Sequence, residues 1–572
     1  MKNKYFLILL FLSCTAFYSF AIKATTWDLQ GIEYNVDTLS HAVIGPGTTS
    51  TALALTGPVK LRVFYTTTDM TNPNVNLKMI MGKDNLISNV KVPDMPASHS
   101  DKKNIYFAGV NADFIGGMGP VGTTFVNGEI YKSYKGTGWY AIGIDTNKKF
   151  YSGATFSTFS LNSPNAGRAT IVAVNTPRSS NELILYTSRK GASTGTAKLG
   201  TEVGAVPVDG ALKSDGATKM RVTIAPVKGV GNMAIPDGGF VLSANGFTEG
   251  VIAKMKVGEE FEITPTMYFN NVEIGGLVEI GGGCPMLLQG GKILNTQGEL
   301  DHLKNREPRT AVGYSSDGTQ AILLVVDGRQ PGISVGVTSK DLAAIMLNLN
   351  CYDALNFDGG GSSTLYVKDL GVRNIPSEGS LRAVKNGLFV TTPATNDIAI
   401  AEIRFADYVG KIAYNSCYKP VIYGYNAQGV LVDTNVKAIT LSCDSKYAKI
   451  QADGTSVLCD VATTFALTAS LGNITTTIPV TVTEGAGVDA VTEDNGAIIY
   501  PNPIRVGEQA YINLHNSAEI SIYSANGNLI NSFKTETKDN SLALPTQSLM
   551  SGIYLVSVID SYSHKTIKLI IK

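Results

Sequence analysis

The sequence predicts an α+β domain with mixed β-sheets and few helices, followed by two small all-β sandwich domains. Three observations lead to this prediction. The chain has 572 residues, which is enough for several domains that each bury a core. Its high content of glycine (59 residues) and tyrosine (25 residues) is typical of β-rich extracellular proteins. Its composition also changes near residue 396 and again near residue 485, so we expect domain boundaries there.

Residues 1–21 have the features of a secretory signal peptide. Lys2 and Lys4 precede an apolar run, and the segment ends in the small-x-small pattern Ser19-Phe20-Ala21. No later run of about 18 apolar residues occurs, so we expect no transmembrane segment in the mature chain. The net charge is zero and only 16% of residues are charged, which argues against nucleic-acid binding.

Residues 22–395 are expected to form one domain built mainly of strands. Apolar and polar residues alternate over 59–67, and the insert 132–270 is also strand-like. One helix is predicted after Thr338 and Asp341, which have the spacing of a capping box. Apolar residues at i, i+3, i+4 and i+7 then define one face of this helix; they are Leu342, Ile345, Met346 and Leu349.

A glycine-rich stretch at 353–367, with the sequence DALNFDGGGSSTLYV, is the strongest candidate for a functional site. Two apolar runs, read as strands, flank a carboxylate, three glycines and two serines; these residues are Asp358, Gly359, Gly360, Gly361, Ser362 and Ser363. Glycines let backbone N–H groups approach a ligand, and successive N–H groups can bind an anion. An isolated run of three glycines is more often a plain hairpin turn. It is not a nucleotide-binding P-loop, because no Gly-Lys-Ser/Thr and no helix follow the glycines.

Two further strand ends carry polar residues that could meet this loop. Arg309 and Thr310 begin one strand, and Asp327 and Arg329 follow the strand over 321–326. Two carboxylates, two arginines and a backbone anion site could together handle a substrate that bears a phosphate. The simpler alternatives are that Asp327 caps its turn, Arg329 is solvated and Thr310 is an ordinary strand residue.

Four motifs, in this order and spacing, resemble the phosphodiester glycosidase family. They are GVNADFIGGMGPVGTTFVNGEIY at 109–131, EIGGGCPMLLQGGKI at 279–293, PRTAVGY with VVDGR at 308–329, and NFDGGGSSTLYV at 356–367. The resemblance covers roughly residues 100–395. It departs from the family pattern at Ile115, where an aromatic residue is usual, and at Cys284, which is inserted before Pro285.

The resemblance implies an exported hydrolase that cleaves sugar-1-phosphodiester linkages and releases N-acetylglucosamine or a related sugar from phosphoglycans. Asp358 or Asp327 would act as nucleophile or base, and Asn111 and Asp113 would line the sugar side. The phosphate would be bound by Arg309, Thr310, Arg329, the glycines 359–361, Ser362 and Ser363. Two other functions stay open: a non-catalytic surface glycan-binding protein and a metal-dependent phosphodiesterase that acts on phosphoglycan polymers.

The sequence predicts no cofactor and no metal site of histidine or cysteine. No CxxC occurs, and the five histidines lack metal-ligand spacing. A hard cation such as Ca²⁺ or Mg²⁺ on the aspartates remains open. Five cysteines follow the signal peptide: Cys284, Cys351, Cys417, Cys443 and Cys459. Cys284 and Cys351 could form a disulfide, but we favour two buried thiols that act as small hydrophobic groups.

Two small domains are expected after residue 395. Residues 396–484 show short strands with Asn-Gly-type turns and resemble bacterial Ig-like β-sandwich modules. Residues 485–496 are acidic and turn-rich, as in a linker. Residues 497–572 contain YPNP, YSANG and SGIY and resemble the C-terminal sorting domain of the type IX secretion system of Bacteroidota. We therefore expect the protein to use that secretion machinery and to be secreted or held at the cell surface, although a β-sandwich without a sorting role is the alternative.

Overall fold

The computed structural model describes the chain in stretches between residues 25 and 571. The described ranges are 25–99, 102–136, 138–208, 210–294, 301–406, 411–413, 416–444, 446–451, 454, 456–459, 461–483, 498–500, 502, 504–514, 517–524, 528–535, 542–560 and 564–571. The predicted signal peptide and the predicted linker at 485–496 lie outside these residues.

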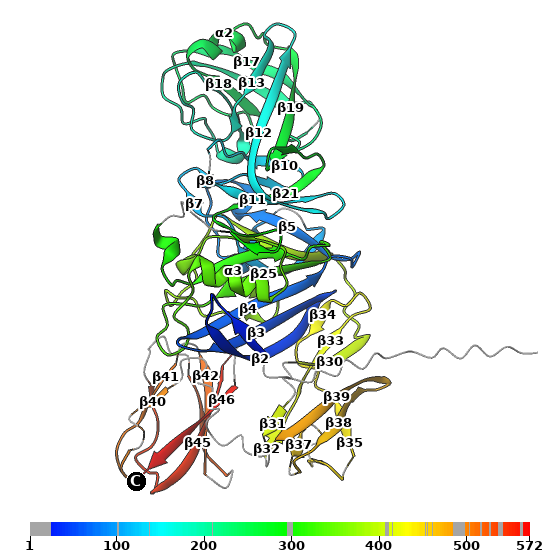
Figure 1. Cartoon of the computed structure of the whole chain (residues 1–572), viewed down its shortest axis with the longest axis vertical. Helices are drawn as coiled ribbons and strands as arrows, with labels where there is room; N and C mark the ends of the chain where they lie inside the picture. Colours follow the sequence, from blue (N-terminus) through cyan, green and yellow to red (C-terminus); the bar gives the residue numbers. More distant parts are fainter. Residues whose placement is uncertain are drawn as a thin grey trace, which may run out of the picture.

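A nine-stranded sheet forms one wall of the central body (Figure 1). In spatial order its strands are β1 (Thr25–Asp28), β2 (Glu33–Gly45), β3 (Thr48–Thr56), β4 (Lys60–Asp69), β25 (Gln320–Val326), β24 (Arg309–Tyr314), β26 (Asp353–Asn356), β22 (Met286–Gln289) and β23 (Lys292–Ile293). Its neighbouring strands are antiparallel, and β4 pairs with β25 although about 250 residues separate them in sequence. N-terminal and C-terminal parts of the domain therefore complete a single sheet.

A five-stranded sheet forms the second wall. In spatial order its strands are β28 (Gly371–Val372), β27 (Leu365–Val367), β6 (Asn104–Asn111), β29 (Asn386–Pro393) and β5 (Asn76–Met81). A short hairpin of β7 (Ile115–Gly116) and β8 (Gly119–Pro120) follows β6. Because β6 lies between β27 and β29, its end at Asn111 reaches the middle of this wall.

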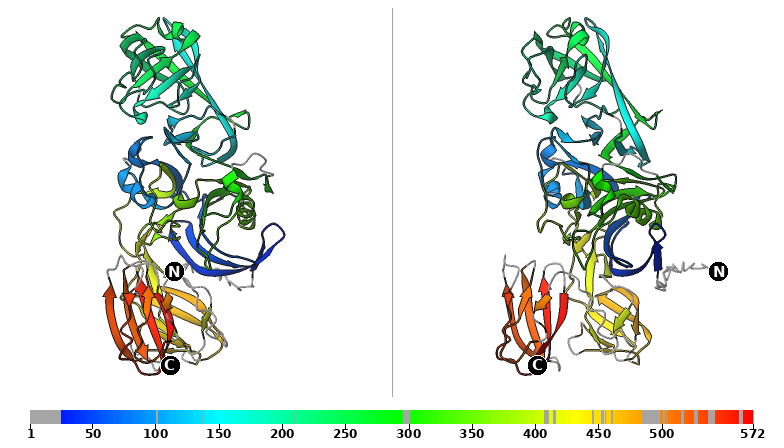
Figure 2. Two further views of the ribbon diagram at one scale, coloured as in Figure 1. Left: turned by 90° about the vertical axis from the view of Figure 1, so that its left-hand side faces the viewer. Right: turned by 60° about the vertical axis from the view of Figure 1, so that its left-hand side comes forward.

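A third sheet extends from the central body into a separate lobe, which Figures 1 and 2 place at the end of the molecule away from the C-terminal domains. Its path is β10 (Glu129–Lys132), β9 (Thr124–Val126), β21 (Leu277–Gly283), β11 (Tyr140–Asp145), β12 (Phe150–Ser163), β19 (Glu260–Phe269), β17 (Thr218–Lys228), β16 (Thr201–Pro207), β18 (Phe240–Ala244), β15 (Leu183–Thr187) and β14 (Ala173–Val174), with β13 (Gly167–Ile171) and β20 (Val272–Glu273) at its sides. This lobe has its own hydrophobic core, which includes Phe159, Leu185, Val203 and Phe261. The strand-like insert of the sequence is thus a folded lobe.

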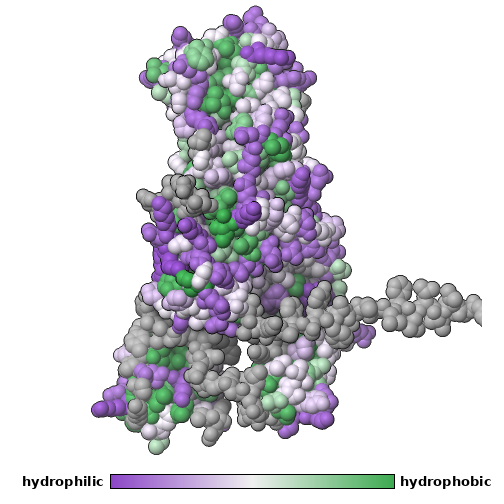
Figure 3. Space-filling view, in the orientation of Figure 1, coloured by the Kyte–Doolittle hydropathy of each residue, from purple (hydrophilic) through white to green (hydrophobic). Residues whose placement is uncertain are grey.

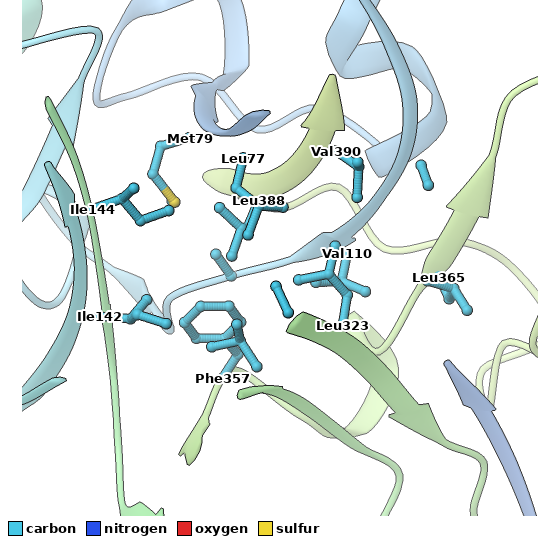
Figure 4. Close-up of a cluster of buried hydrophobic side chains, with 14 of the residues drawn as sticks. Leu77, Met79, Val110, Ile142, Ile144, Leu323, Phe357, Leu365, Leu388 and Val390 are labelled. Atoms are coloured by element: carbon cyan, nitrogen blue, oxygen red, sulfur yellow. The ribbon is translucent and has the colours of Figure 1, made fainter. Parts of the chain in front are cut away.

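The core of the central body joins all three sheets (Figure 4). Ile142 and Ile144 of β11 meet Leu388 of β29 and Leu323 of β25, and the ring of Phe357 lies among them. Phe357 is fully buried, so the residue before Asp358 is fixed in the core. The start of the glycine loop is therefore held by packing.

The predicted helix is α3 (Ser339–Asn348), which is the longest helix among the described residues. Its capping box is formed as expected: the Thr338 hydroxyl accepts the N–H of Asp341, and the Asp341 carboxylate accepts the N–H of Thr338. Leu342, Ile345 and Met346 pack on the face of the nine-stranded sheet that turns away from the other walls. The other short helices are η1 (Gly82–Asp84), η2 (Val92–Asp94), α1 (Met95–Ser98), η3 (Ser188–Lys190), η4 (Gly246–Thr248), α2 (Glu249–Ile252), η5 (Asp301–Lys304) and η6 (Gly360–Ser362).

Two small β-domains follow and lie at the opposite end of the molecule from the lobe (Figures 1 and 2). The first contains β30 (Glu402–Ala406), β33 (Val421–Tyr425) and β34 (Leu431–Asp433); β31 (Lys411–Ala413), β39 (Ile474–Thr483), β38 (Thr464–Leu471) and β35 (Thr440–Cys443); and β32 (Ser416–Tyr418), β37 (Val457–Cys459) and β36 (Lys449–Ile450). The second contains β40 (Ile498–Tyr500), β41 (Tyr511–Asn513) and β44 (Leu542–Ala543), with β43 (Leu529–Thr535), β42 (Ala518–Ser524), β45 (Gly552–Asp560) and β46 (His564–Ile571). Each domain has its own hydrophobic core. The predicted fold class is confirmed, whereas the Ig-like type of the first domain and the domain boundaries stay predictions.

Polar and charged residues cover most of the face seen in Figure 3, and apolar residues form only small patches there. No helix among the described residues is long and apolar enough to cross a membrane. Among the described residues, Cys284, Cys351, Cys443 and Cys459 form no disulfide, and Cys284 and Cys351 are buried, as favoured from the sequence. The side chain of Cys417 lies outside the described part of the structure.

Candidate functional site

The glycine loop crosses from one wall of the central body to the other. β26, before the loop, pairs with β22 and β24 of the nine-stranded sheet, whereas β27, after it, pairs with β6 and β28 of the five-stranded sheet. The two flanking strands are not partners, so the loop is not a hairpin turn. Residues 357–364 instead lie where the two walls meet.

Backbone hydrogen bonds fix the loop against both walls. The N–H of Phe357 donates to the carbonyl of Thr310 (2.9 Å), and that of Asp358 to the carbonyl of Ala112 (2.8 Å). The N–H of Gly360 donates to the carbonyl of Pro308 (2.8 Å). This last bond uses one of the N–H groups that we expected to bind an anion, so the loop offers fewer free donors than its sequence suggested.

Asn111 holds both ends of the loop with one side chain. Its Nδ2 donates to the carbonyl of Asp358 (2.7 Å), and its Oδ1 accepts from the Thr310 hydroxyl (2.9 Å) and from the N–H of Thr364 (3.1 Å). Asn111 and Thr310 are fully buried. Both therefore position the loop from behind, and the structure gives neither a place that faces a ligand.

Each of the three glycines has a separate structural reason. A Cβ on Gly359 would lie 2.7 Å from the carbonyl oxygen of Pro308. Gly360 has a φ of +62°, in the left-handed region that favours glycine. A Cβ on Gly361 would lie 2.2 Å from the carboxyl carbon of Glu378, so this glycine lets the Glu378 side chain lie close to the loop.

Asp358 is a largely buried carboxyl group within this loop. Burial raises its pKa to about 6, although the Ser362 hydroxyl, the charge of Arg382 and the N–H of Gly359 each act to lower it. The carboxyl therefore changes charge near neutral pH, which is a property of acid–base groups in active sites. Ser362 is fully buried and its hydroxyl also accepts from Arg382 (3.4 Å).

A network of exposed charged side chains lies over the loop. Arg382 donates through Nη2 to Oε1 of Glu378 and through Nε to Oε2 of Glu378, and the Nε–Oε2 distance is 3.2 Å. Arg329 lies against Gly360 and pairs with Glu307 (Nε–Oε2 2.5 Å) and more distantly with Glu378 (4.0 Å). Arg329 itself has a φ of +61°, an uncommon conformation for a residue with a side chain. Two arginines thus flank the loop with a carboxylate between them.

Asp327 lies beneath the loop and is fully buried. Its carboxylate accepts from the N–H of Ile375 (3.2 Å) and from the side-chain amide of Asn374 (3.2 Å). Asn374 also donates to the carbonyl of Ser363 (3.1 Å) and accepts the N–H of Leu365. Asp327 is thus connected to the loop through Asn374.

Asp113, two residues after Asn111 in the chain, carries a further buried carboxylate. It accepts the N–H groups of Phe114 (2.8 Å) and Gly122 (2.6 Å) and the indole N–H of Trp139 (3.1 Å). Burial raises its pKa to about 6, whereas burial lowers the pKa of nearby Lys132 to about 8. Three donors around one carboxylate fix the segment that follows β6.

Half-buried aromatic rings gather beside Asp113. Phe114 and Trp139 meet edge to face at 5.3 Å between centroids, and Tyr134 lies 6.3 Å from Trp139. Such rings offer apolar faces on which a sugar ring can pack. These rings lie beside Asp113, which is two residues after Asn111 in the chain.

Arg309 occupies a different place from the one suggested by the sequence. Its side chain is 2% exposed and donates to the carbonyls of Leu303, Asn305 and Val337. It therefore ties the segments around β24 together beneath the loop. The residue begins its strand as expected, but its side chain turns inward and donates to these carbonyls.

Sequence reasoning missed Arg382, Glu378 and Asn374. All three lie between β28 and β29, in a stretch without regular periodicity, so no pattern placed them near residue 358. Several buried polar atoms near the loop have no hydrogen-bond partner in the structure; those within the described residues include Ser363 Oγ, Ser377 Oγ, Gln330 Oε1, Asn356 Oδ1 and Asn386 Nδ2. Such atoms are rare in proteins and are commonly satisfied by water or a ligand. Among the described residues, no group of three or more side chains is placed to hold a metal ion.

Comparison with known proteins identifies two parts of the chain. Residues 206–391 match the family model of the phosphodiester glycosidases. The chain carries a phosphodiester glycosidase domain. Residues 498–572 match the secretion system C-terminal sorting domain, so the chain also carries a sorting domain of the type IX system and is a secreted or cell-surface protein.

Three solved structures are similar to the chain. A hypothetical protein from Synechocystis has 18% identity and a TM-score of 0.49, over 60% of this chain and 62% of that one. A protein from Burkholderia pseudomallei has 16% identity and a TM-score of 0.47, over 64% of this chain and 100% of that one. The zebrafish N-acetylglucosamine-1-phosphodiester alpha-N-acetylglucosaminidase catalytic domain, auto-inhibited by its pro-peptide, has 14% identity and a TM-score of 0.32, over 64% of this chain and 88% of that one. A search of curated proteins gives no match.

Proposed function

We propose that the phosphodiester glycosidase domain hydrolyses a sugar-1-phosphodiester at the loop 357–364. The observation that carries this proposal is the place of Asp358. Its largely buried carboxyl titrates near pH 6 in a loop that Arg329 and Arg382 flank. A carboxylate beside two guanidinium groups suits a reaction in which a negatively charged leaving group departs from a sugar.

In this proposal the two arginines neutralise the phosphate. Arginine presents several donors in a plane and binds phosphate oxygens in pairs. The phosphate monoester that departs is already a good leaving group. Neutralising its charge therefore contributes more to the reaction than protonating it. Arg329 and Arg382 take the role that the sequence suggested for Arg309, because the Arg309 guanidinium is buried and bonded to backbone carbonyls.

Asp358 supplies the second half of the reaction. In its ionised form it can attack the anomeric carbon or activate a water molecule, and it stabilises the positive charge that develops on the sugar ring. The net reaction adds water across one bond and releases a free sugar and a phosphate monoester. Phe114 and Trp139 are suited to pack against the sugar, while Asn111, Thr310 and Asp327 hold the loop in place.

The test is turnover of a panel of sugar-1-phosphodiesters by the mature protein in water labelled with ¹⁸O. We expect hydrolysis with the label in the sugar, which means that the C–O bond breaks. Label in the phosphate would contradict attack at the anomeric carbon. Absence of turnover across the panel would favour a glycan-binding protein, and activity lost on chelation would favour a metal-dependent phosphodiesterase.

A further inference from the structure

Glu378 occupies the place between the two arginines where the proposed function puts the phosphate. Its carboxylate accepts from Arg382 and lies 4.0 Å from Nη1 of Arg329. It also lies directly over Gly361, since a Cβ on that glycine would approach the carboxylate oxygens to 2.3 and 2.4 Å. An anionic group of this chain thus fills the anion position of the loop.

The contacts of Glu378 are of a kind that can exchange. The side chains of Glu378 and Arg382 are each 39% exposed and that of Arg329 is 43% exposed. Exposed ion pairs are weak because water competes for both partners. A phosphate can take paired hydrogen bonds from each arginine, so it is a better partner for them than one carboxylate.

Two observations support exchange of the Glu378 carboxylate for an anionic ligand. The hydroxyls of Ser363, in the loop, and of Ser377, next to Glu378, are buried and lack a hydrogen-bond partner in the structure. Charge also balances: Arg329 and Arg382 face Glu307 and Glu378 within the described residues, and a phosphodiester carries the same charge as the carboxylate that it would replace.

We propose that Glu378 is a specificity-determining residue that occupies the phosphate position in the absence of substrate and is displaced by an anionic substrate. A phosphodiester can compete with the carboxylate for the two arginines, whereas a neutral glycoside offers nothing that draws the carboxylate away. Glu378 would therefore disfavour neutral glycosides. This inference rests on the proposed function, because it requires that Arg329 and Arg382 bind the phosphate.

Binding of inorganic phosphate to the full mature chain, measured by calorimetry, tests this inference without turnover. Glu378→Gln keeps the shape of the side chain and removes its charge, so we expect phosphate to bind roughly tenfold more tightly, equivalent to the loss of two exposed ion pairs. Glu307→Gln is the matched control, since it also removes a charge from Arg329 but Glu307 is not among the groups nearest to Gly361. A clearly smaller effect of the control supports the inference; equal effects, or none from Glu378→Gln, overturn it.

A second pair of measurements separates this inference from the proposed function. Arg382→Met should abolish phosphate binding in the wild-type and Glu378→Gln backgrounds alike; if it does not, the phosphate position itself is wrong. Glu378→Ala, which also removes the bulk, should narrow the ratio of kcat/KM between a sugar-1-phosphodiester and a neutral aryl glycoside of the same sugar. An unchanged ratio with intact phosphate binding would overturn the role of Glu378 and leave the phosphate position standing.

Discussion

Asp358 combines burial, a raised pKa and a loop that arginines flank. We predict that Asp358→Asn removes most turnover, by a factor of about 10² to 10⁴, and leaves substrate binding largely intact. Asparagine keeps the size and one acceptor but cannot act as nucleophile or base. Steady-state kinetics with circular dichroism as the folding control would check this. Near wild-type turnover in a folded variant would remove Asp358 from the mechanism.

The same group sets the pH dependence that we expect. Because burial raises the pKa of Asp358 to about 6, the carboxyl is protonated below that pH and ionised above it. If the ionised form reacts, kcat/KM falls as the pH drops through about 6. A profile that is flat from pH 5 to 8 would contradict this assignment.

The stability of the folded protein should depend on pH in the direction opposite to that of its activity. A native pKa above the unfolded value of about 3.9 means that the folded state binds the proton more tightly. The protonated carboxyl therefore contributes fully to the stability of the folded state below the unfolded pKa, and this contribution is lost as the pH rises through the native pKa of about 6. Asp358→Asn should therefore raise the free energy of unfolding at pH 7.5, by at most about 3 kcal/mol, and change it little at pH 4. Thermal melts at both pH values would check this, and equal shifts would point to a different cause.

Arg382 and Arg309 should behave differently although both lie near the loop. Arg382→Met is predicted to raise KM for phosphodiester substrates and to leave the melting temperature nearly unchanged, since its ion pair is exposed. Arg309→Met would remove the buried guanidinium that donates to the carbonyls of Leu303, Asn305 and Val337, which we expect to cost about 3 kcal/mol or more of stability. Paired kinetics and denaturant melts distinguish the two roles. A large loss of stability in Arg382→Met would contradict the assignment.

At the scale of elements, the loop 357–364 depends on glycine for its path. Gly360→Val is predicted to abolish activity, because valine resists a φ of +62° and its side chain would meet Arg329. The stability cost should stay at about 1–3 kcal/mol, since the residue lies outside the core. Activity assays together with denaturant melts would check this. A folded variant with normal turnover would mean that the loop is not part of the site.

Local patterns predicted some elements well. The spacing of Thr338 and Asp341 and the apolar face of the segment identified α3, because a cap and a helical period are local properties. The loop at 358–363 could be found because its three glycines stand beside a carboxylate and two serines, between two apolar runs. The direction of the Arg309 side chain could not, because the carbonyls that it binds lie in other segments. Arg382 and Glu378 lie in irregular chain, where only the tertiary structure brings them to the loop.

At the scale of the whole molecule, the sorting domain has its own core and is expected to act as a separable unit. We predict that a chain truncated before Asn495 folds its phosphodiester glycosidase domain but stays in the periplasm. Fractionation of a producing strain, with phosphodiester hydrolysis as the measure of folding, would check this. Equal amounts of truncated and full-length protein in the culture medium would contradict the sorting role.

The long-range arrangement could not be predicted from any single stretch of sequence. β4 and β25 pair although the whole lobe lies between them in the chain, and β6 pairs with β27 and β29. The order of strands in a sheet depends on which distant strands pair. Strands with similar apolar patterns look alike in the sequence, so the pattern does not select one partner. The family match at 206–391 likewise begins inside the lobe and omits β4, β5 and β6.

The hydrogen bonds by which Asn111 holds both ends of the loop have a consequence for the time at which the protein becomes active. Asn111 and Asp358 are 247 positions apart, and β29, which ends at Pro393, must be in place before β6 has both of its neighbours and before β5 has the one strand with which it pairs in this sheet. An emerging chain therefore carries unpaired strand edges until nearly 400 residues have been made, and contacts of such separation form slowly. We expect the nascent protein to be inert and vulnerable to aggregation for most of its synthesis, and to acquire activity in one late step.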